Sequence, residues 1–207
     1  MKSRIAPKVI RIFPVDIESM NLLSRKVAGS LILIGAAQFV VGMMIAEALY
    51  GDYSIRDNYI SDLGVGSSAL VFNGSIFLLG LLTLVASYIF WRVVHARLIT
   101  ILILASAIGA MGVGIFTEDA GVIHVIVSVV TFLFGGISAI AAYRLEKVPL
   151  NYISVILGVM VLVALALFGT GNFLGIGKGG MERMIAYPIL LWAVAFGAYL
   201  VGVEEKS

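Results

Sequence analysis

The sequence predicts an all-α fold, a polytopic bundle of six transmembrane helices. Of the 207 residues, 61% are hydrophobic and only 13% are charged, whereas soluble domains carry about 25% charged residues. The mean hydropathy is +1.09. Six apolar runs are each long enough to cross a hydrocarbon core of about 30 Å at a rise of about 1.5 Å per residue. We therefore expect a multi-pass protein of the cell membrane.

Residues 1–26 precede the first of these runs and are basic. Four lysines and arginines before Pro14 alternate with apolar residues, and the proline interrupts any continuous helix. We expect this segment to lie on the cytoplasmic surface of the membrane. A cleaved signal peptide is the alternative, but the run at 27–50 is longer than the apolar region of a signal peptide. We expect this run to be retained as the first span.

The apolar runs are joined by short linkers, so consecutive helices should pack as antiparallel neighbours. Gly109 and Gly112 in the third run and Gly135 in the fourth allow neighbouring helices to approach closely. A Gly-rich linker separates the fifth run from the sixth. Residues 27–203 then form one domain, with spans at about 27–50, 68–91, 98–116, 122–143, 151–171 and 184–202.

Lysine and arginine are distributed unequally between the two ends of this bundle. Eleven of the 14 lie in the termini and in the second and fourth linkers, and three lie in the other linkers. Positive residues favour the cytoplasmic side of a membrane. We therefore expect both termini to be cytoplasmic and the first, third and fifth linkers to face outward.

The composition excludes several classes of function. The chain has no cysteine, which excludes thiol catalysis, iron–sulfur ligation and disulfides. Its two histidines are too few for a site that needs three imidazoles. No basic stripe indicates a nucleic-acid partner, so membrane lipids are the expected partners.

The densest polar stretch between the runs covers residues 52–64 in the first linker. If residues 57–63 form a helical turn, Asn58, Ser61 and Asp62 fall at positions i, i+3 and i+4 on one face. Their side chains would then converge. A solvated loop with ordinary capping residues is the alternative.

His124 stands in the first turn of the fourth run, with Ser128 and Thr131 on the same helical stripe. An ionisable residue in a span usually faces the bundle interior and indicates a functional site. An interfacial histidine that bonds to a backbone carbonyl is the alternative. The expected partners of His124 are Asp62, Glu118 and Asp119.

Three sets of candidate site residues follow from these patterns. The catalytic candidates are Asp62, Glu118 and His124, and the candidate ligands of a divalent metal ion are Asp62, Glu118, Asp119 and His124. The candidate ligand-binding residues are Ser54, Asn58, Ser61, Asn73, Asp119, Glu182 and Arg183.

The expected outer end carries more acids than bases. Its three cations stand against seven acids, a formal balance of 3 − 7 = −4, the acids being Glu47, Asp52, Asp57, Asp62, Glu118, Asp119 and Glu182. So many carboxylates need a counter-charge or protonation, so a metal ion or an amine-bearing ligand fits better than a bare anion. Phosphate binding at the Gly-rich start of the sixth helix is an alternative, but the run matches no Walker or Rossmann pattern.

Several short motifs resemble a known family. They are Tyr53-Ser54 with Asn58-x-Ile60-Ser61-Asp62-Leu63-Gly64, Asn73-Gly74-Ser75, Gly114-Ile115-Phe116-x-Glu118-Asp119 with Gly121-x-Ile123-His124, and Gly180-x-Glu182-Arg183 with Leu190-Leu191-Trp192. From the first span onward, the chain resembles a prokaryotic six-span membrane-protein family catalogued as domain of unknown function 998 (DUF998). The resemblance implies a six-helix membrane fold and no established activity.

Three functions remain open, and we rank a site for a lipid or small amphiphile first. In an enzyme of this kind, His124 would act as a general base, or a metal ion would activate water. Ser61 as a nucleophile is a further alternative, but no nucleophile-elbow motif surrounds it. A structural or sensory membrane protein ranks second. A cation or small-solute transporter ranks third, because the polar residues gather at one end and not near the midplane.

Overall fold

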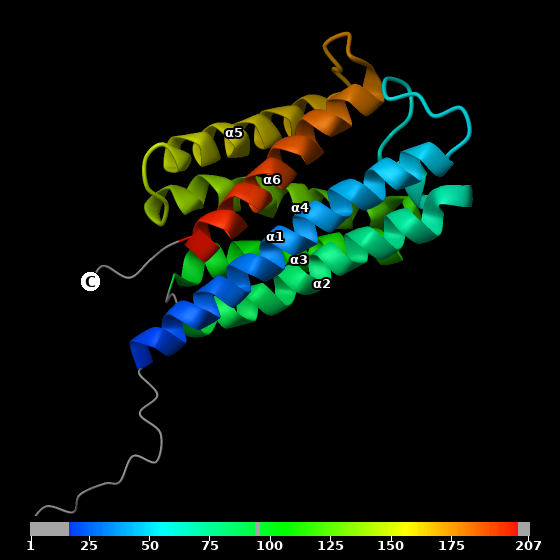
Figure 1. Ribbon diagram of the computed structural model, residues 1–207. Coiled ribbons are helices and arrows are strands. Elements are labelled where there is room, and N and C mark those ends of the chain that lie inside the picture. Colours follow the sequence, from blue (N-terminus) through cyan, green and yellow to red (C-terminus); the bar gives the residue numbers. More distant parts are fainter. Residues whose placement is uncertain (1–16, 94–95, 203–207) are drawn as a thin grey trace, which may run out of the picture.

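The computed structural model describes residues 17–93 and 96–202, and every regular element in this part of the chain is a helix (Figure 1). Six long helices are apolar enough to cross a membrane. They are α1 (Ile17–Leu49), α2 (Ala69–Val93), α3 (Arg97–Ile115), α4 (Val122–Ala141), α5 (Leu150–Gly169) and α6 (Gly177–Gly202). Four 3-10 turns accompany them: η1 (Ser61–Gly64), η2 (Gly66–Ser68), η3 (Glu118–Ala120) and η4 (Ala142–Arg144). The predicted all-α, six-helix membrane fold is confirmed.

The predicted bounds of the middle four helices lie within two residues of those observed, whereas α1 and α6 both begin earlier than expected. Helix α1 starts at Ile17 and passes without a break through residue 26. The rest of the basic N-terminal segment lies outside the described residues, so its surface position stays a prediction. Helix α6 starts at Gly177, so the expectation that the Gly-rich run is a linker before residue 184 was wrong.

The six helices form a closed ring in which each one packs against its neighbours in the chain and α6 packs against α1. Helix α4 also contacts α6 across the ring. Small residues make these contacts close. A Cβ added at Gly29 would lie 2.7 Å from the carbonyl oxygen of Gly197, and one added at Gly109 would lie 2.6 Å from Thr131 Oγ1. Glycines therefore set the distances between these helices, as expected for a membrane bundle.

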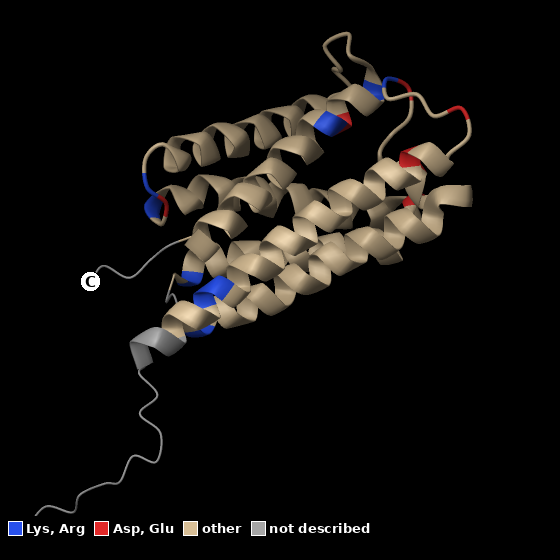
Figure 2. Ribbon diagram, in the orientation of Figure 1, with Lys and Arg blue, Asp and Glu red and all other residues tan. Residues whose placement is uncertain are grey.

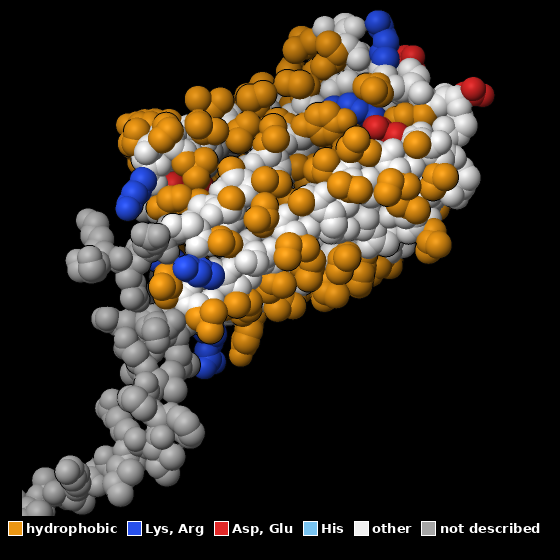
Figure 3. All heavy atoms as spheres, viewed as in Figure 1, with side chains coloured by type: hydrophobic (Ala, Val, Ile, Leu, Met, Phe, Trp, Pro, Cys, Tyr) orange, Lys and Arg blue, Asp and Glu red, His pale blue; other side chains and the backbone are white. Residues whose placement is uncertain are grey.

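Charged residues gather at the two ends of the bundle (Figure 2). Apolar side chains cover the sides between them (Figure 3). One end, here called the polar end, holds the α1–α2 connection (50–68), the α3–α4 connection (116–121) and the α5–α6 connection (170–176). The topology therefore brings together the three segments that hold most of the candidate site residues. Which end faces the cytoplasm stays a prediction from the lysine and arginine distribution.

Candidate functional site

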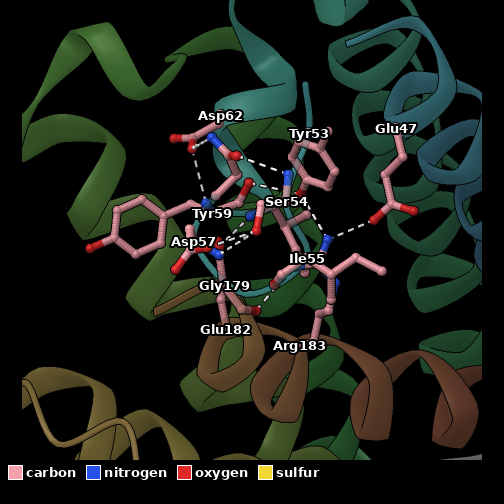
Figure 4. Close-up of polar contacts among 12 residues, drawn as sticks. Glu47, Tyr53, Ser54, Ile55, Asp57, Tyr59, Asp62, Gly179, Glu182 and Arg183 are labelled. Atoms are coloured by element: carbon pink, nitrogen blue, oxygen red, sulfur yellow. Dashed lines mark hydrogen bonds and ion pairs between the residues drawn. The ribbon is translucent and has the colours of Figure 1, made fainter. Parts of the chain in front are cut away.

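The α1–α2 connection lies against the beginning of α6, where Arg183 holds it (Figure 4). Arg183 Nη1 donates to the carbonyl oxygens of Ile55 at 3.1 Å and Gly179 at 3.0 Å. Arg183 Nη2 donates to Glu47 Oε1 at 2.6 Å and to the Tyr53 hydroxyl at 2.8 Å. One buried side chain therefore joins α1, the connection and α6.

Tyr53 extends this network into the connection itself. Its hydroxyl donates to the carbonyl oxygen of Tyr59 at 2.9 Å. Burial raises the pKa of Tyr53 to about 12, although the hydrogen bond and charge of Arg183 favour the ionised form. The phenol therefore keeps its proton at neutral pH. The Lys178 ammonium makes a cation–π contact with the Tyr59 ring, and its Nζ lies 4.1 Å from the ring centroid.

The first turn of α6 is shaped to receive the backbone of the connection. The amide of Gly179 donates to the carbonyl oxygen of Arg56 at 3.0 Å, and the amide of Ile60 donates to Glu182 Oε2. A Cβ added at Gly179 would lie 1.9 Å from the carbonyl oxygen of Asn58. Glycine is therefore needed here for close packing between helix and loop, and its Gly-rich run belongs to the helix and not to a linker.

Asp62 is the centre of a second set of hydrogen bonds within the connection. Its Oδ2 accepts from Asn58 Nδ2 and from the amide of Tyr59, both at 2.9 Å. Asn58 Oδ1 accepts from the Ser54 amide at 3.0 Å, and Ser54 Oγ donates to Asp57 at 2.9 Å. The side chains of Asn58 and Asp62 thus converge, although residues 57–60 do not form the helical turn from which this was predicted and the 3-10 turn begins only at Ser61. Many of these polar atoms bond within the chain, and their role in ligand binding stays a prediction.

Asp62 also forms a carboxyl pair with Glu118 of η3, which joins the first two polar connections. Burial raises the pKa of Glu118 to about 7, and the hydrogen bond and charge of Asp62 add to the shift. Burial also opposes ionisation of Asp62. Hydrogen bonds from Glu118, Asn58 and the Tyr59 amide outweigh that effect and lower the pKa of Asp62. We therefore describe the pair as an Asp62 carboxylate that accepts a hydrogen bond from a Glu118 carboxyl group.

His124 is buried in the first turn of α4, with 9% of its surface exposed. Its Nδ1 lies 2.8 Å from the carbonyl oxygen of Phe116, and its Nε2 lies 3.3 Å from Ser128 Oγ. A carbonyl oxygen only accepts hydrogen bonds, so Nδ1 carries a proton, which makes Nε2 the acceptor in the neutral form of the ring. The predicted alternative of a carbonyl-bonded histidine is thus present, with the second ring nitrogen directed at a serine.

Two cavities meet at His124. A groove of about 610 Å³ lies between α4, α5 and α6 at the polar end. A smaller cavity of about 100 Å³ lies deeper in the ring. Both are lined by Ser61, His124, Ser128, Phe132 and Glu182. These side chains therefore stand between the groove and the bundle interior.

The candidate metal ligands do not all come together. Glu118 and His124 line the groove, Asp62 contacts Glu118, and Asp119 is exposed. Among residues 17–93 and 96–202, no three His, Asp or Glu side chains form a group that could hold a metal ion. The predicted metal site therefore gains no support from the arrangement of these side chains.

Asn73 lies apart from the other candidate ligand-binding residues. Its Nδ2 donates to the carbonyl oxygen of Gly64 at 2.8 Å, and its buried Oδ1 has no hydrogen-bond partner. The hydrogen bond from Asn73 joins the end of η1 to α2.

Sequence reasoning did not single out Tyr53 or Ser128 as site residues. The signal for Ser128 was its position one turn after His124 on the same face of a helix. Tyr53 stands in one of the motifs that resemble the DUF998 family, but no local pattern indicated its partner Arg183, which is 130 residues away in the chain.

The comparison with known families agrees with the family resemblance of the motifs at the polar end. A family model described as "Protein of unknown function (DUF998)" matches residues 33–199. No curated protein and no solved structure matches the chain. The match covers all of α2 to α5, most of α6 and about half of α1. The chain therefore belongs to the DUF998 family of proteins of unknown function.

Proposed function

We propose that this multi-pass membrane protein binds a lipid or another small amphiphile in the groove between α4, α5 and α6. The groove's volume of about 610 Å³ falls within the range of about 300–1,000 Å³ that is typical of small-molecule sites. It is lined by a set of polar side chains, here called the polar wall, and by a set of apolar side chains, here called the apolar wall, and this combination carries the proposal.

The polar wall consists of side chains that lie in or next to the three connections of the polar end. Ser61 and Glu118 come from η1 and η3, His124 comes from the first turn of α4, and Glu182 comes from the second turn of α6. Hydroxyl, carboxyl and imidazole groups in one place can hold a hydrogen-bonding head group. The acidic character of this wall favours a neutral or amine-bearing head group over an anionic one.

The apolar wall faces the side of the bundle. It includes Val125, Val129, Leu165 and Phe168. Val125 and Val129 are 58% and 40% exposed, so the groove opens sideways, where lipid chains surround a membrane protein. An apolar chain can therefore enter along this wall while its head group contacts the polar wall.

Of the two other functions, the structural role has the stronger support. The Arg183 network joins α1, the α1–α2 connection and α6, and its polar atoms are largely paired within the chain. We assign that network to holding the fold and the groove to binding. Transport gains less support, because mainly apolar side chains line the deeper cavity.

Photo-crosslinking in nanodiscs tests the proposal. The probe is a monoacylglycerol with a diazirine in its chain, and labelled peptides are identified by mass spectrometry. We expect labelling to concentrate on the 121–132 segment of α4 and on 165–169 of α5, and to fall in Val129→Trp, whose indole fills the groove. Val159→Trp is the matched control, because Val159 is 46% exposed and does not line the groove. Labelling spread evenly over the apolar helices, or unchanged in Val129→Trp, would contradict the proposal.

A further inference from the structure

The hydroxyl of Ser128 has a different kind of hydrogen-bond partner from the other side-chain hydroxyl groups of α4. Thr131 Oγ1 and Ser138 Oγ each donate to the carbonyl oxygen four residues earlier, at 2.7 Å. This is the usual arrangement for serine and threonine inside a helix. Ser128 Oγ instead lies 3.3 Å from His124 Nε2. Its hydroxyl is therefore directed at a proton acceptor and not at the backbone.

His124 is held in the orientation that a general base requires. The 2.8 Å contact between Nδ1 and the Phe116 carbonyl fixes the ring and its tautomer, and leaves Nε2 free to accept a proton. A nucleophile, a base and a third group that orients the base are the recurring parts of nucleophilic catalysis. The 3.3 Å distance is long, but such contacts commonly shorten when substrate binds.

Both side chains lie where a bound amphiphile would place its reacting group. Ser128 and His124 line the groove and the deeper cavity, and in α4 they are followed directly by Val129 and Val125 of the apolar wall. In an amphiphile with an ester, the ester group joins the head to the chain, and so it would lie near these two side chains. Ser61 lines the same groove, and its hydroxyl is available there as a hydrogen-bond donor toward an oxyanion.

We propose that Ser128 is the nucleophile, and His124 the base, of an acyl-transfer reaction on an ester-bearing amphiphile. This inference rests on the proposed function, because the amphiphile must first bind in the groove. It differs from the Ser61 alternative and from a metal-activated water, since both reacting groups come from adjacent turns of α4.

The steps balance with water as the second reactant. Ser128 Oγ bonds to the ester carbonyl carbon while its proton passes to His124 Nε2. The carbon–oxygen bond to the alcohol then breaks, and the alcohol oxygen takes the proton from Nε2. A water molecule attacks the acyl group, its proton passes to Nε2, and the bond to Oγ breaks as Oγ recovers the proton. The products are a carboxylic acid and an alcohol.

A cysteine substitution tests the pair without knowledge of the substrate. The chain has no cysteine, so Ser128→Cys introduces a single thiol. A neighbouring imidazole lowers a thiol pKa and increases the thiolate fraction. We expect iodoacetamide to alkylate Ser128→Cys about tenfold faster at neutral pH than the Ser128→Cys/His124→Asn double variant. Val125→Cys, a thiol in the same groove that leaves α4 about 100° around the helix axis from His124, should react at the same rate with and without His124→Asn. Equal rates with and without His124 in the Ser128→Cys background would overturn the proposal.

Labelling of the wild-type chain provides an independent measurement. An alkyl fluorophosphonate reacts with activated serines, and mass spectrometry locates the adduct. We expect the adduct on Ser128, its loss in Ser128→Ala, and at least a tenfold reduction in His124→Asn, while Thr131→Ser, whose hydroxyl bonds to the backbone, keeps it. An adduct on Ser61, or none on the folded protein, would contradict the assignment of Ser128.

The two proposals fail in different ways. The diazirine monoacylglycerol should label Ser128→Ala as strongly as the wild type, because the hydroxyl acts in the reaction and not in holding the chain. Groove labelling without fluorophosphonate labelling of Ser128 would remove the acyl-transfer proposal alone. Absence of groove labelling would remove the proposed function.

Discussion

Arg183 and Glu47 are 136 residues apart in the sequence and form an ion pair with a 2.6 Å distance between Nη2 and Oε1. Their side chains are 6% and 22% exposed. The pair connects the last turns of α1 to the beginning of α6, and the same guanidinium bonds to Tyr53 and to the Ile55 carbonyl. The polar end is thus held by one cation that satisfies several acceptors at once.

Replacing Arg183 by leucine should destabilise the fold strongly. The substitution leaves Glu47 and the Ile55 carbonyl without their donor, and breaking a buried ion pair costs about 3–5 kcal/mol. Because Glu47 is partly exposed, we expect about 3 kcal/mol. Chemical unfolding in detergent measures the change. Arg56→Leu, at an exposed position of the same connection, is the control and should change stability little; equal effects of the two variants would contradict this assignment.

Gly179→Ala should disrupt the packing of the α1–α2 connection on α6. The added Cβ would lie 1.9 Å from the Asn58 carbonyl oxygen and 2.5 Å from that of Ile55, and backbone atoms cannot move away without breaking the loop's hydrogen bonds. We expect a lower melting temperature and faster proteolysis within residues 50–60.

The neighbouring glycine is a matched control for that experiment. A Cβ at Gly180 meets the Ile176 side chain at 3.2 Å, which can adjust. Alanine also favours a helix over glycine by about 1 kcal/mol. Gly180→Ala should therefore be neutral or stabilising. If both alanine variants behaved alike, close backbone packing at Gly179 would not be the reason for its glycine.

Much of this fold was readable from the sequence, because spans are set by hydropathy and length. The Asn58–Asp62 contact was readable only in part, since the helical turn that predicted it begins at Ser61 and does not include Asn58. The start of α6 was not. Its glycines indicate a linker by intrinsic propensity, and only the backbone of the distant connection, packed at Gly179, explains why they are helical. Likewise nothing local to Glu47 indicates Arg183 as its partner.

The Asp62–Glu118 pair should make the contact between η1 and η3 depend on pH. The pKa of Glu118 is raised to about 7 from an ordinary value of about 4.3. Its contribution to stability is therefore full below the ordinary value and is lost as pH rises through about 7. Asp62, whose pKa is lowered, contributes in the opposite sense at acidic pH. Lys178 and Glu182 are the other charged groups that act on Glu118, and they oppose each other.

Thermal unfolding at a series of pH values checks this expectation. The melting temperature of the wild type should fall between about pH 5 and about pH 8. Glu118→Gln keeps a donor for Asp62 and removes the titration, so its melting temperature should change less over the same range. A steeper or unchanged dependence in Glu118→Gln would show that the carboxyl pair is not the responsible group.

The tautomer of His124 is the most direct check on the chemistry proposed for the groove. The 2.8 Å contact with the Phe116 carbonyl requires a proton on Nδ1, and nitrogen-15 spectra of labelled histidine distinguish the two ring nitrogens. The chain has two histidines, so His124→Asn identifies the signals. We expect a neutral ring with Nδ1 protonated, and the same tautomer in Ser128→Ala, because the carbonyl and not the serine fixes it. If the proton were found on Nε2 instead, His124 would have no free acceptor toward Ser128 and the serine could not be activated in this way.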